Sequence, residues 1–329
     1  MSFDQSIIEF DNDNYNNQEL KACLERFGVS IIKNVLDPEY CDNTFYEICD
    51  TLNYVTSNLD KPFDVNNSST WNTLEKLKPV KGMIFQNWGL GHCQPIWNLR
   101  CNRNIINVFE KIYETNDLLV SYDAFSFLPP PEITRKNWHS NSWYHCDQKL
   151  SNDFLECYQG WISLTDTDIG DATLSVILKS HRMHYDFKRI FNIEEKGDFV
   201  MMKDHIDELL RMFPFVEHRI TCPKGSLVLW DSRLLHSGDL PLKTRKNANF
   251  RCVSYLCYTP RSLCTPSNLK RKKQLLYKRG NNGYLRTTNH YPHRPVMFPE
   301  IPRFCDKNLS IVKLPDPFIS EEFNYLTGF

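Results

Sequence analysis

The stretch Asn141-Ser-Trp-Tyr-His-Cys-Asp-Gln148 places an imidazole and a carboxylate two residues apart in an aromatic, strand-like context. In an extended backbone, residues i and i+2 point to the same face, so His145 and Asp147 can bind one metal ion while Cys146 points away. A third ligand must come from elsewhere, and His236 is the best candidate. Two His and one carboxylate leave positions open on an octahedral ion, an arrangement that suits Fe(II).

The dipeptide pattern alone is weak, because roughly one His-x-acid match is expected by chance and the chain has three. His205 and Asp207 lie in a segment with apolar residues at helical spacing, and on a helix residues i and i+2 diverge. His184 and Asp186 follow the end of a predicted strand and have no β-branched run around them. The pattern therefore favours His145 as the ligand, with a hydrogen-bonded structural histidine as the alternative.

Length and composition restrict the classes of protein. The 329 residues can form one large domain, and a hydrophobic fraction of 41% is enough for a sizeable core. A net charge of −1 gives no general preference for nucleic acid or membranes. The twelve cysteines include no Cys-x-x-Cys, which is typical of buried free thiols. With no signal-peptide pattern and no run of about 18 apolar residues, we expect an intracellular, cytoplasmic protein.

Hydrophobic periodicity predicts many short strands in the middle of the chain and helices towards both ends. This order favours a mainly β protein with α elements, built on a double-stranded β-helix (a jelly-roll, cupin-like core) with flanking N- and C-terminal helices. The predicted helices are 18–27, 38–52, 104–113, a helical stretch over 186–213, and 268–279. The predicted strands are 7–10, 29–33, 118–128, 157–165, 172–178, 216–221, 226–230 and 251–258.

The predicted core domain covers residues 1–261, and residues 262–329 are expected to pack on it as a basic helix and a Pro-rich tail. Residues 53–81 are predicted to be an insertion, and the basic stretch 270–279 to be a surface helix. Both are expected to shape substrate access. An anionic partner for 270–279 is the alternative, and nucleic acid is possible there but not favoured.

From Phe27 to Arg261 the chain resembles the phytanoyl-CoA dioxygenase-like branch of the Fe(II)/2-oxoglutarate-dependent oxygenases. The resemblance rests on the His-x-Asp of His145 and Asp147, the distal His236, a downstream Arg, and three stretches. These are Phe-Gly-Val-Ser-Ile-Ile-Lys-Asn-Val-Leu-Asp (27–37), Gly-Trp-Ile-Ser-Leu-Thr-Asp (160–166) and Ala-Thr-Leu-Ser-Val-Ile-Leu-Lys-Ser-His (172–181). Lys179 stands where the family usually has glycine.

The resemblance implies Fe(II), 2-oxoglutarate as co-substrate, and dioxygen. The metal ligands would be His145, Asp147 and His236. An Arg would bind the far carboxylate of 2-oxoglutarate, because its planar fork matches a carboxylate. Arg251 is preferred, since its competitor Arg245 is expected to lie in a solvated loop.

The resemblance also suggests roles for neighbouring strand residues. Trp161 would lie near 2-oxoglutarate, Thr173 and Ser175 would donate hydrogen bonds to it, and Gln159 would face the substrate. Because Asp147 is a carboxylate, and related halogenases have a small residue there, the resemblance implies a hydroxylase. The substrate, a small molecule or an anion, and the oligomeric state are left open.

Two other functions are compatible with the residues. One is a zinc hydrolase that uses His181 and His184 with His145, although the acid of His-Glu-x-x-His is missing. The other is a catalytically silent oxygenase-like fold that binds a partner through 270–279.

Overall fold

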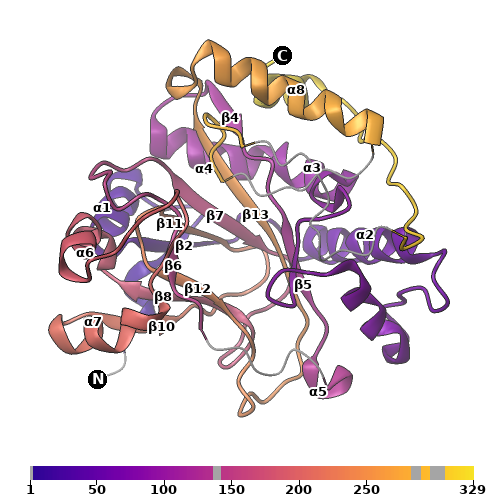
Figure 1. Ribbon diagram of the computed structural model, residues 1–329, viewed down its shortest axis with the longest axis horizontal. Coiled ribbons are helices and arrows are strands. Elements are labelled where there is room, and N and C mark those ends of the chain that lie inside the picture. The colour runs from indigo at the N-terminus through magenta and orange to yellow at the C-terminus, as the bar shows by residue number, and fades with distance from the viewer. Residues whose placement is uncertain (1–2, 136–141, 283–289, 297–307) are drawn as a thin grey trace.

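Two β-sheets and nine α-helices form the mixed α/β structure of residues 3–135, 142–282, 290–296 and 308–329, the part described by the computed structural model (Figure 1). The helices are α1 (Asn17–Phe27), α2 (Pro38–Thr56), α3 (Gln94–Arg100), α4 (Arg103–Tyr113), α5 (Pro131–Thr134), α6 (His184–Ile190), α7 (Ile206–Met212), α8 (Pro266–Asn282) and α9 (Glu321–Thr327). Within these ranges, no helix combines the length and apolar character that a membrane crossing needs.

The strands divide into an eight-stranded and a five-stranded sheet. The larger sheet has the order β1-β2-β11-β7-β13-β5-β3, with β4 paired to β13, and the smaller has the order β10-β8-β12-β6-β9. The strands are β1 (Glu9–Asp11), β2 (Val29–Lys33), β3 (Ile84–Phe85), β4 (Leu118–Val120), β5 (Phe125–Leu128), β6 (His145–Cys146), β7 (Tyr158–Ser163), β8 (Thr173–Leu178), β9 (Val200–Met201), β10 (Val216–Arg219), β11 (Leu227–Asp231), β12 (His236–Asp239) and β13 (Arg251–Pro260).

The two sheets pack against each other through one apolar cluster. Trp161 and Val253 of the larger sheet lie in the same buried cluster as Val176 and Leu178 of β8. A larger cluster lies on the other face of the eight-stranded sheet, where α2, α3 and α4 cover it. The functional site described below lies between the sheets.

The predicted N-terminal helices are present, and their ends have the expected caps. The Asn16 side chain accepts the N–H of Gln18 before α1, and Gly28 ends that helix in the left-handed conformation. The Asp37 side chain accepts the N–H of Tyr40, with Pro38 in the first turn of α2. That helix runs to Thr56, four residues further than periodicity predicted.

Three predicted segments are wrong in their details. The strand predicted over 118–128 is two strands, β4 and β5, because the connection between them leaves the regular ladder with β13. The helical stretch over 186–213 is interrupted by β9, which pairs with β6 beside the site. Residues 5–8 form a 3-10 helix, and the strand predicted over 7–10 begins only at Glu9.

The predicted basic surface helix and the predicted insertion both pack on the core. Lys272 of α8 is fully buried, and its Nζ donates to the Val120 carbonyl and lies 3.9 Å from the centre of the Tyr122 ring. Burial lowers the pKa of Lys272 to about 7. Within 53–81, a 3-10 helix over Ser68–Leu77 buries Trp71, Leu74 and Leu77. Each segment therefore buries one face on the core, while Lys270 and Arg271 of the basic helix are exposed.

Gly28 illustrates a position where glycine is required. Its φ is +82°, and a Cβ there would lie 2.5 Å from Nδ1 of His181 and 2.6 Å from Cδ1 of Leu234. We expect Gly28→Ala to lower the free energy of unfolding by about 1 to 3 kcal/mol, measured by chemical denaturation. Gly197→Ala is the matched control, since a Cβ at Gly197 has nothing within 4 Å. Equal stability of the two variants would contradict this packing.

Candidate metal centre and cavity

His145 and His236 are brought together by strand pairing in the smaller sheet. They are directly opposed residues of the antiparallel strands β6 and β12. Opposed residues have their side chains on the same face about 5 Å apart, so register alone juxtaposes the imidazoles. Their ring centres are 4.2 Å apart.

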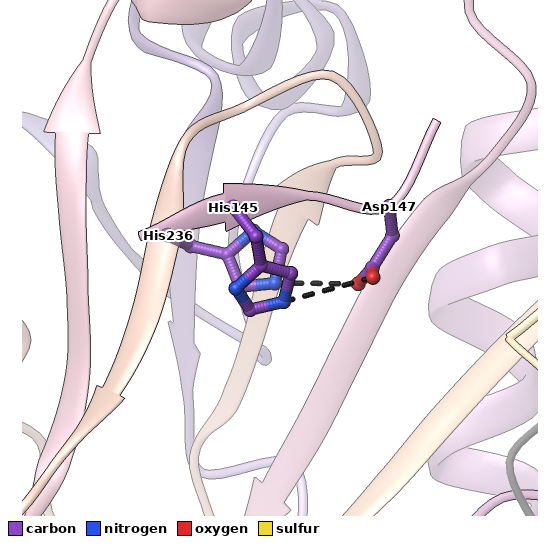
Figure 2. Close-up of side chains that lie close together, drawn as sticks. All are labelled: His145, Asp147 and His236. Carbon is purple, nitrogen blue, oxygen red and sulfur yellow. Dashed lines mark ion pairs between the residues drawn. The ribbon is translucent and has the colours of Figure 1, made fainter. Parts of the chain in front are cut away.

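Asp147 completes the cluster from the residues that follow β6. Nε2 of His145 lies 3.6 Å from Oδ1 of Asp147, and Nε2 of His236 lies 3.3 Å from its Oδ2 (Figure 2). Ligand atoms that bind one ion at about 2.1 Å and at right angles are about 3 Å apart. Among the described His, Cys, Asp and Glu residues, only these three converge closely enough to bind a metal ion. The spacing fits the facial set predicted from the sequence.

The backbone fixes which nitrogen each imidazole presents. Nδ1–H of His145 donates to the Trp143 carbonyl at 3.0 Å, and Nδ1–H of His236 donates to the Leu234 carbonyl at 2.9 Å. A carbonyl can only accept, so each Nδ1 carries a proton and Nε2, which faces Asp147, is the nitrogen with the lone pair in the neutral ring. This is the tautomer that binds a metal ion.

Burial and neighbouring charge favour the metal-binding protonation states. All three residues are at most 4% exposed. Burial, aided by His236, lowers the pKa of His145 to about 3. Burial opposes ionisation of Asp147, yet the imidazoles of His290, His145 and His236 hold the pKa of Asp147 well below its usual range. The cluster therefore offers a neutral His145 and an anionic carboxylate at neutral pH.

Gln159 and Tyr291 hold Asp147 in place. Nε2 of Gln159 donates to Oδ2 of Asp147 at 3.0 Å, and the Tyr291 hydroxyl donates to the Asp147 carbonyl oxygen. The sequence interpretation had Gln159 facing the substrate. Its register on β7 instead directs the amide at the carboxylate ligand, so Gln159 positions Asp147.

We expect Gln159→Leu to weaken Fe(II) binding about 10- to 100-fold, the usual effect of losing a residue that orients a metal ligand. Leucine has a similar volume but cannot donate to Asp147. Anaerobic Fe(II) titration measures the affinity, and Gln18→Leu on the exposed side of α1 is the control. Unchanged affinity in Gln159→Leu would show that Asp147 is held without this amide.

The cluster opens onto a cavity of about 490 Å³ between the two sheets. Its wall is largely apolar and aromatic, with Trp143 and Phe199 flanking His145 and with Leu174, Met201 and Trp230 nearby. From the segment predicted to be an insertion, only Val80 and Lys81 reach it, and none of the described α8 side chains does. Of the two segments predicted to shape substrate access, only the end of the first lines the cavity among the described side chains.

Arg251 is buried in the wall of the same cavity. Its Nε donates to Oγ of Ser126 at 3.3 Å and its Nη1 donates to the Ala172 carbonyl at 3.0 Å. The guanidinium lies 5.5 Å from the centre of the Trp161 ring, which is fully buried. No carboxylate of the described chain pairs with Arg251, so its charge is available to a ligand. The Trp161 ring packs against the guanidinium of Arg251 and does not line the cavity.

Arg245 lies in an exposed loop, as the sequence predicted, but its side chain turns inward and is not solvated. Its side chain is 2% exposed and forms ion pairs with Glu132 at 2.6 Å and Asp171 at 2.9 Å. Two carboxylates compensate its charge, so Arg245 is a structural residue. This leaves Arg251 as the stronger candidate for binding an anion.

Thr173 and Ser175 point away from the cavity. The Thr173 hydroxyl donates to the Ile220 carbonyl at 2.6 Å, and the Ser175 hydroxyl donates to the Asp239 carboxylate at 2.5 Å. Side chains alternate along β8, and Leu174 between them is the one that lines the cavity. The predicted contact of these hydroxyls with a co-substrate is therefore wrong.

His181 and His184 lie apart from the metal cluster. Nε2 of His181 hydrogen-bonds to the Glu25 carbonyl and Nε2 of His184 to the Gln148 carbonyl, and both line a different cavity. They do not converge with His145, so the structure contradicts the zinc site of the hydrolase alternative.

Two functional candidates were missed from the sequence. Asp123 and His290 both line the cavity and pair with each other, although they are 167 positions apart. The signal for Asp123 was a lone carboxylate in an apolar strand-like run. His290 stands in the C-terminal tail, where no motif marks it.

The comparisons agree with this site. No protein-family model matches the chain. It is 26% identical over 298 residues to Ava biosynthesis cluster protein O of Aspergillus versicolor, covering 87% of this chain and 89% of the relative. It is 25% identical over 288 residues to a protein of Dictyostelium discoideum provisionally named phytanoyl-CoA dioxygenase, covering 76% and 77%.

Solved structures show the same fold. The epimerase SnoN, solved with Fe³⁺, α-ketoglutarate and nogalamycin RO, matches with a TM-score of 0.51 at 11% identity, covering 93% of this chain and 96% of SnoN. This likeness concerns the fold alone. In sequence the chain resembles phytanoyl-CoA dioxygenase-like proteins, and it has the buried His-Asp-His cluster expected from that resemblance.

Proposed function

We propose that this protein is an Fe(II)- and 2-oxoglutarate-dependent dioxygenase that hydroxylates a small molecule. The observation that carries the proposal is the convergence of two imidazole Nε2 atoms and one carboxylate on a cavity whose wall also holds Arg251, which has no carboxylate partner among the described residues. When bound, iron and 2-oxoglutarate supply an oxidant from dioxygen and release succinate and CO₂.

The residues of the site would have separate roles. His145, Asp147 and His236 would hold the iron, with their orientation fixed by Trp143, Leu234 and Gln159. Arg251 would bind the far carboxylate of 2-oxoglutarate, because its guanidinium is buried, permanently charged and not paired with any acid in the described ranges. The aromatic wall would exclude water from the reacting groups.

Hydroxylation is proposed over other outcomes because the third ligand position holds a carboxylate. The fold itself is shared with SnoN, which is named an epimerase, so it does not select the reaction. A relative named for a biosynthesis cluster supports a small-molecule substrate.

We also propose that the two facing sheets form a double-stranded β-helix within residues 1–261, and that 262–329 belongs to the same domain. In support, Leu275, Phe323 and Leu326 of the C-terminal helices lie in the main core cluster. An intracellular, cytoplasmic location stays a prediction.

The test is 2-oxoglutarate turnover by the purified protein. With Fe(II) and dioxygen, we expect slow succinate formation without substrate, and no succinate when Fe(II) is omitted or replaced by Zn(II). A mass-spectrometric search for products about 16 Da heavier than cell-extract components would then identify the substrate. If iron-loaded protein forms no succinate, either without substrate or with cell extract, the result would favour a catalytically silent binding module.

A further inference from the structure

Asp123 and His290 line the cavity, and neither is among the residues proposed to bind iron or 2-oxoglutarate directly. We propose that His290, held by Asp123, orients the substrate, and that the substrate is a neutral molecule with an apolar body and one hydroxyl or carbonyl oxygen near the oxidised carbon. This inference rests on the proposed function for the identity of the site.

Asp123 is a fixed carboxylate in the cavity wall. It is 4% exposed, its Oδ1 accepts the N–H of Ala124 at 2.7 Å, and its carbonyl accepts a hydrogen bond from the buried Arg100 at 2.6 Å. The backbone and the side chain are thus both held. The remaining oxygen, Oδ2, accepts Nδ1–H of His290 at 2.7 Å.

This contact leaves the other edge of the His290 imidazole for a ligand. Nδ1 is occupied by Asp123, the side chain is 37% exposed, and the residue lines the cavity. Nε2 lies 3.8 Å from Oδ2 of Asp147, too far for a hydrogen bond. A substrate oxygen bound at Nε2 would therefore lie beside the iron site.

The segment that carries His290 is anchored on both sides of the cavity. The Tyr291 hydroxyl donates to the Asp147 carbonyl. Arg294 forms ion pairs with Glu156 and, at 3.2 Å, with Asp198. These contacts do not involve Asp123. The segment that carries the imidazole is therefore held by several separate contacts.

The other residues of the cavity wall indicate which kind of substrate skeleton the cavity would bind. Trp143, Phe199 and Trp230 present aromatic surface, and Leu174 and Met201 add apolar side chains. Such a wall binds carbon skeletons, and a few placed polar groups fix their orientation. Asp198 pairs with Arg294 through Oδ2 and Asp123 pairs with His290, so each of these carboxylates already faces a cationic or hydrogen-bonding side chain.

Two probes of the same shape test the inference: 4-methylphenol and p-xylene, which differ by one hydroxyl group. Their dissociation constants are measured by ligand-observed NMR on anaerobic protein loaded with Fe(II) and 2-oxoglutarate. We expect the wild type to bind 4-methylphenol about fivefold more tightly, the usual net effect of one hydrogen bond. His290→Leu should remove that preference while p-xylene affinity stays within about twofold.

Further variants complete the test. Asp123→Asn should reduce the preference, since an amide holds Nδ1–H less strongly than a carboxylate. His205→Ala is the matched control, because His205 packs on Phe191 away from the cavity and should keep the full preference. A preference that survives in His290→Leu, no preference in the wild type, or no binding of either probe would overturn the inference. The visible charge-transfer band of the Fe(II)–2-oxoglutarate complex is recorded first, and its absence in the wild type would instead refute the proposed function.

Discussion

Replacing His145, Asp147 or His236 by alanine is expected to abolish stoichiometric Fe(II) binding and all 2-oxoglutarate turnover. Each residue supplies one of the three donors that converge in the described part of the chain, and Asp147 supplies the negative charge. Losing a residue that merely orients a ligand costs about 10- to 100-fold in metal affinity, so losing a ligand should cost more. Asp147→Ala should be the most severe, because it removes the carboxylate donor and leaves two imidazoles.

The measurement is the iron content after anaerobic reconstitution and desalting, together with succinate formation. His205→Ala is the control, since it removes an imidazole of another His-x-acid pair that lies outside the cavity. Circular dichroism melting curves separate loss of the site from loss of the fold. Near-normal iron content in His145→Ala would rule out this metal centre.

The sequence predicted the parts of the site that depend on local geometry. Alternation along an extended segment placed His145 and Asp147 on one side, and the structure brings them together although β6 itself ends at Cys146. The caps at Asp37 and Gly28 located helix ends for the same reason, because each is a contact between near neighbours in the chain.

Residues whose roles depend on register or distant contacts were not predictable in this way. A shift of one residue along β8 exchanges the two faces, and the sequence interpretation placed Thr173 and Ser175 on the wrong one. Arg245 is buried by Glu132 and Asp171, which no local pattern links to it. The pairing of Asp123 with His290 likewise arises only when the C-terminal segment crosses the cavity.

Arg251→Lys is expected to raise the 2-oxoglutarate concentration needed for half-maximal turnover by a factor of about 5 to 150. Lysine keeps the positive charge but loses the planar fork that binds a carboxylate through two parallel hydrogen bonds. The loss corresponds to about 1 to 3 kcal/mol for a charge-assisted bond in a buried site. Titration of 2-oxoglutarate against succinate formation measures it, and the charge-transfer band gives the affinity without turnover.

Arg245→Lys separates this role from a general effect of losing a buried guanidinium. Arg245 is bound through Nε and Nη2 to Glu132 and through Nη1 to Asp171, so none of its three nitrogens is left for a co-substrate. Its replacement should lower the free energy of unfolding and leave the 2-oxoglutarate requirement near the wild-type value. Arg251 has no acidic partner to lose within the described chain. Its replacement should therefore raise the 2-oxoglutarate requirement and change the free energy of unfolding less than Arg245→Lys does. A larger rise in the requirement for Arg245→Lys than for Arg251→Lys would contradict this assignment, because it would mean that 2-oxoglutarate displaces two carboxylates already bound to Arg245.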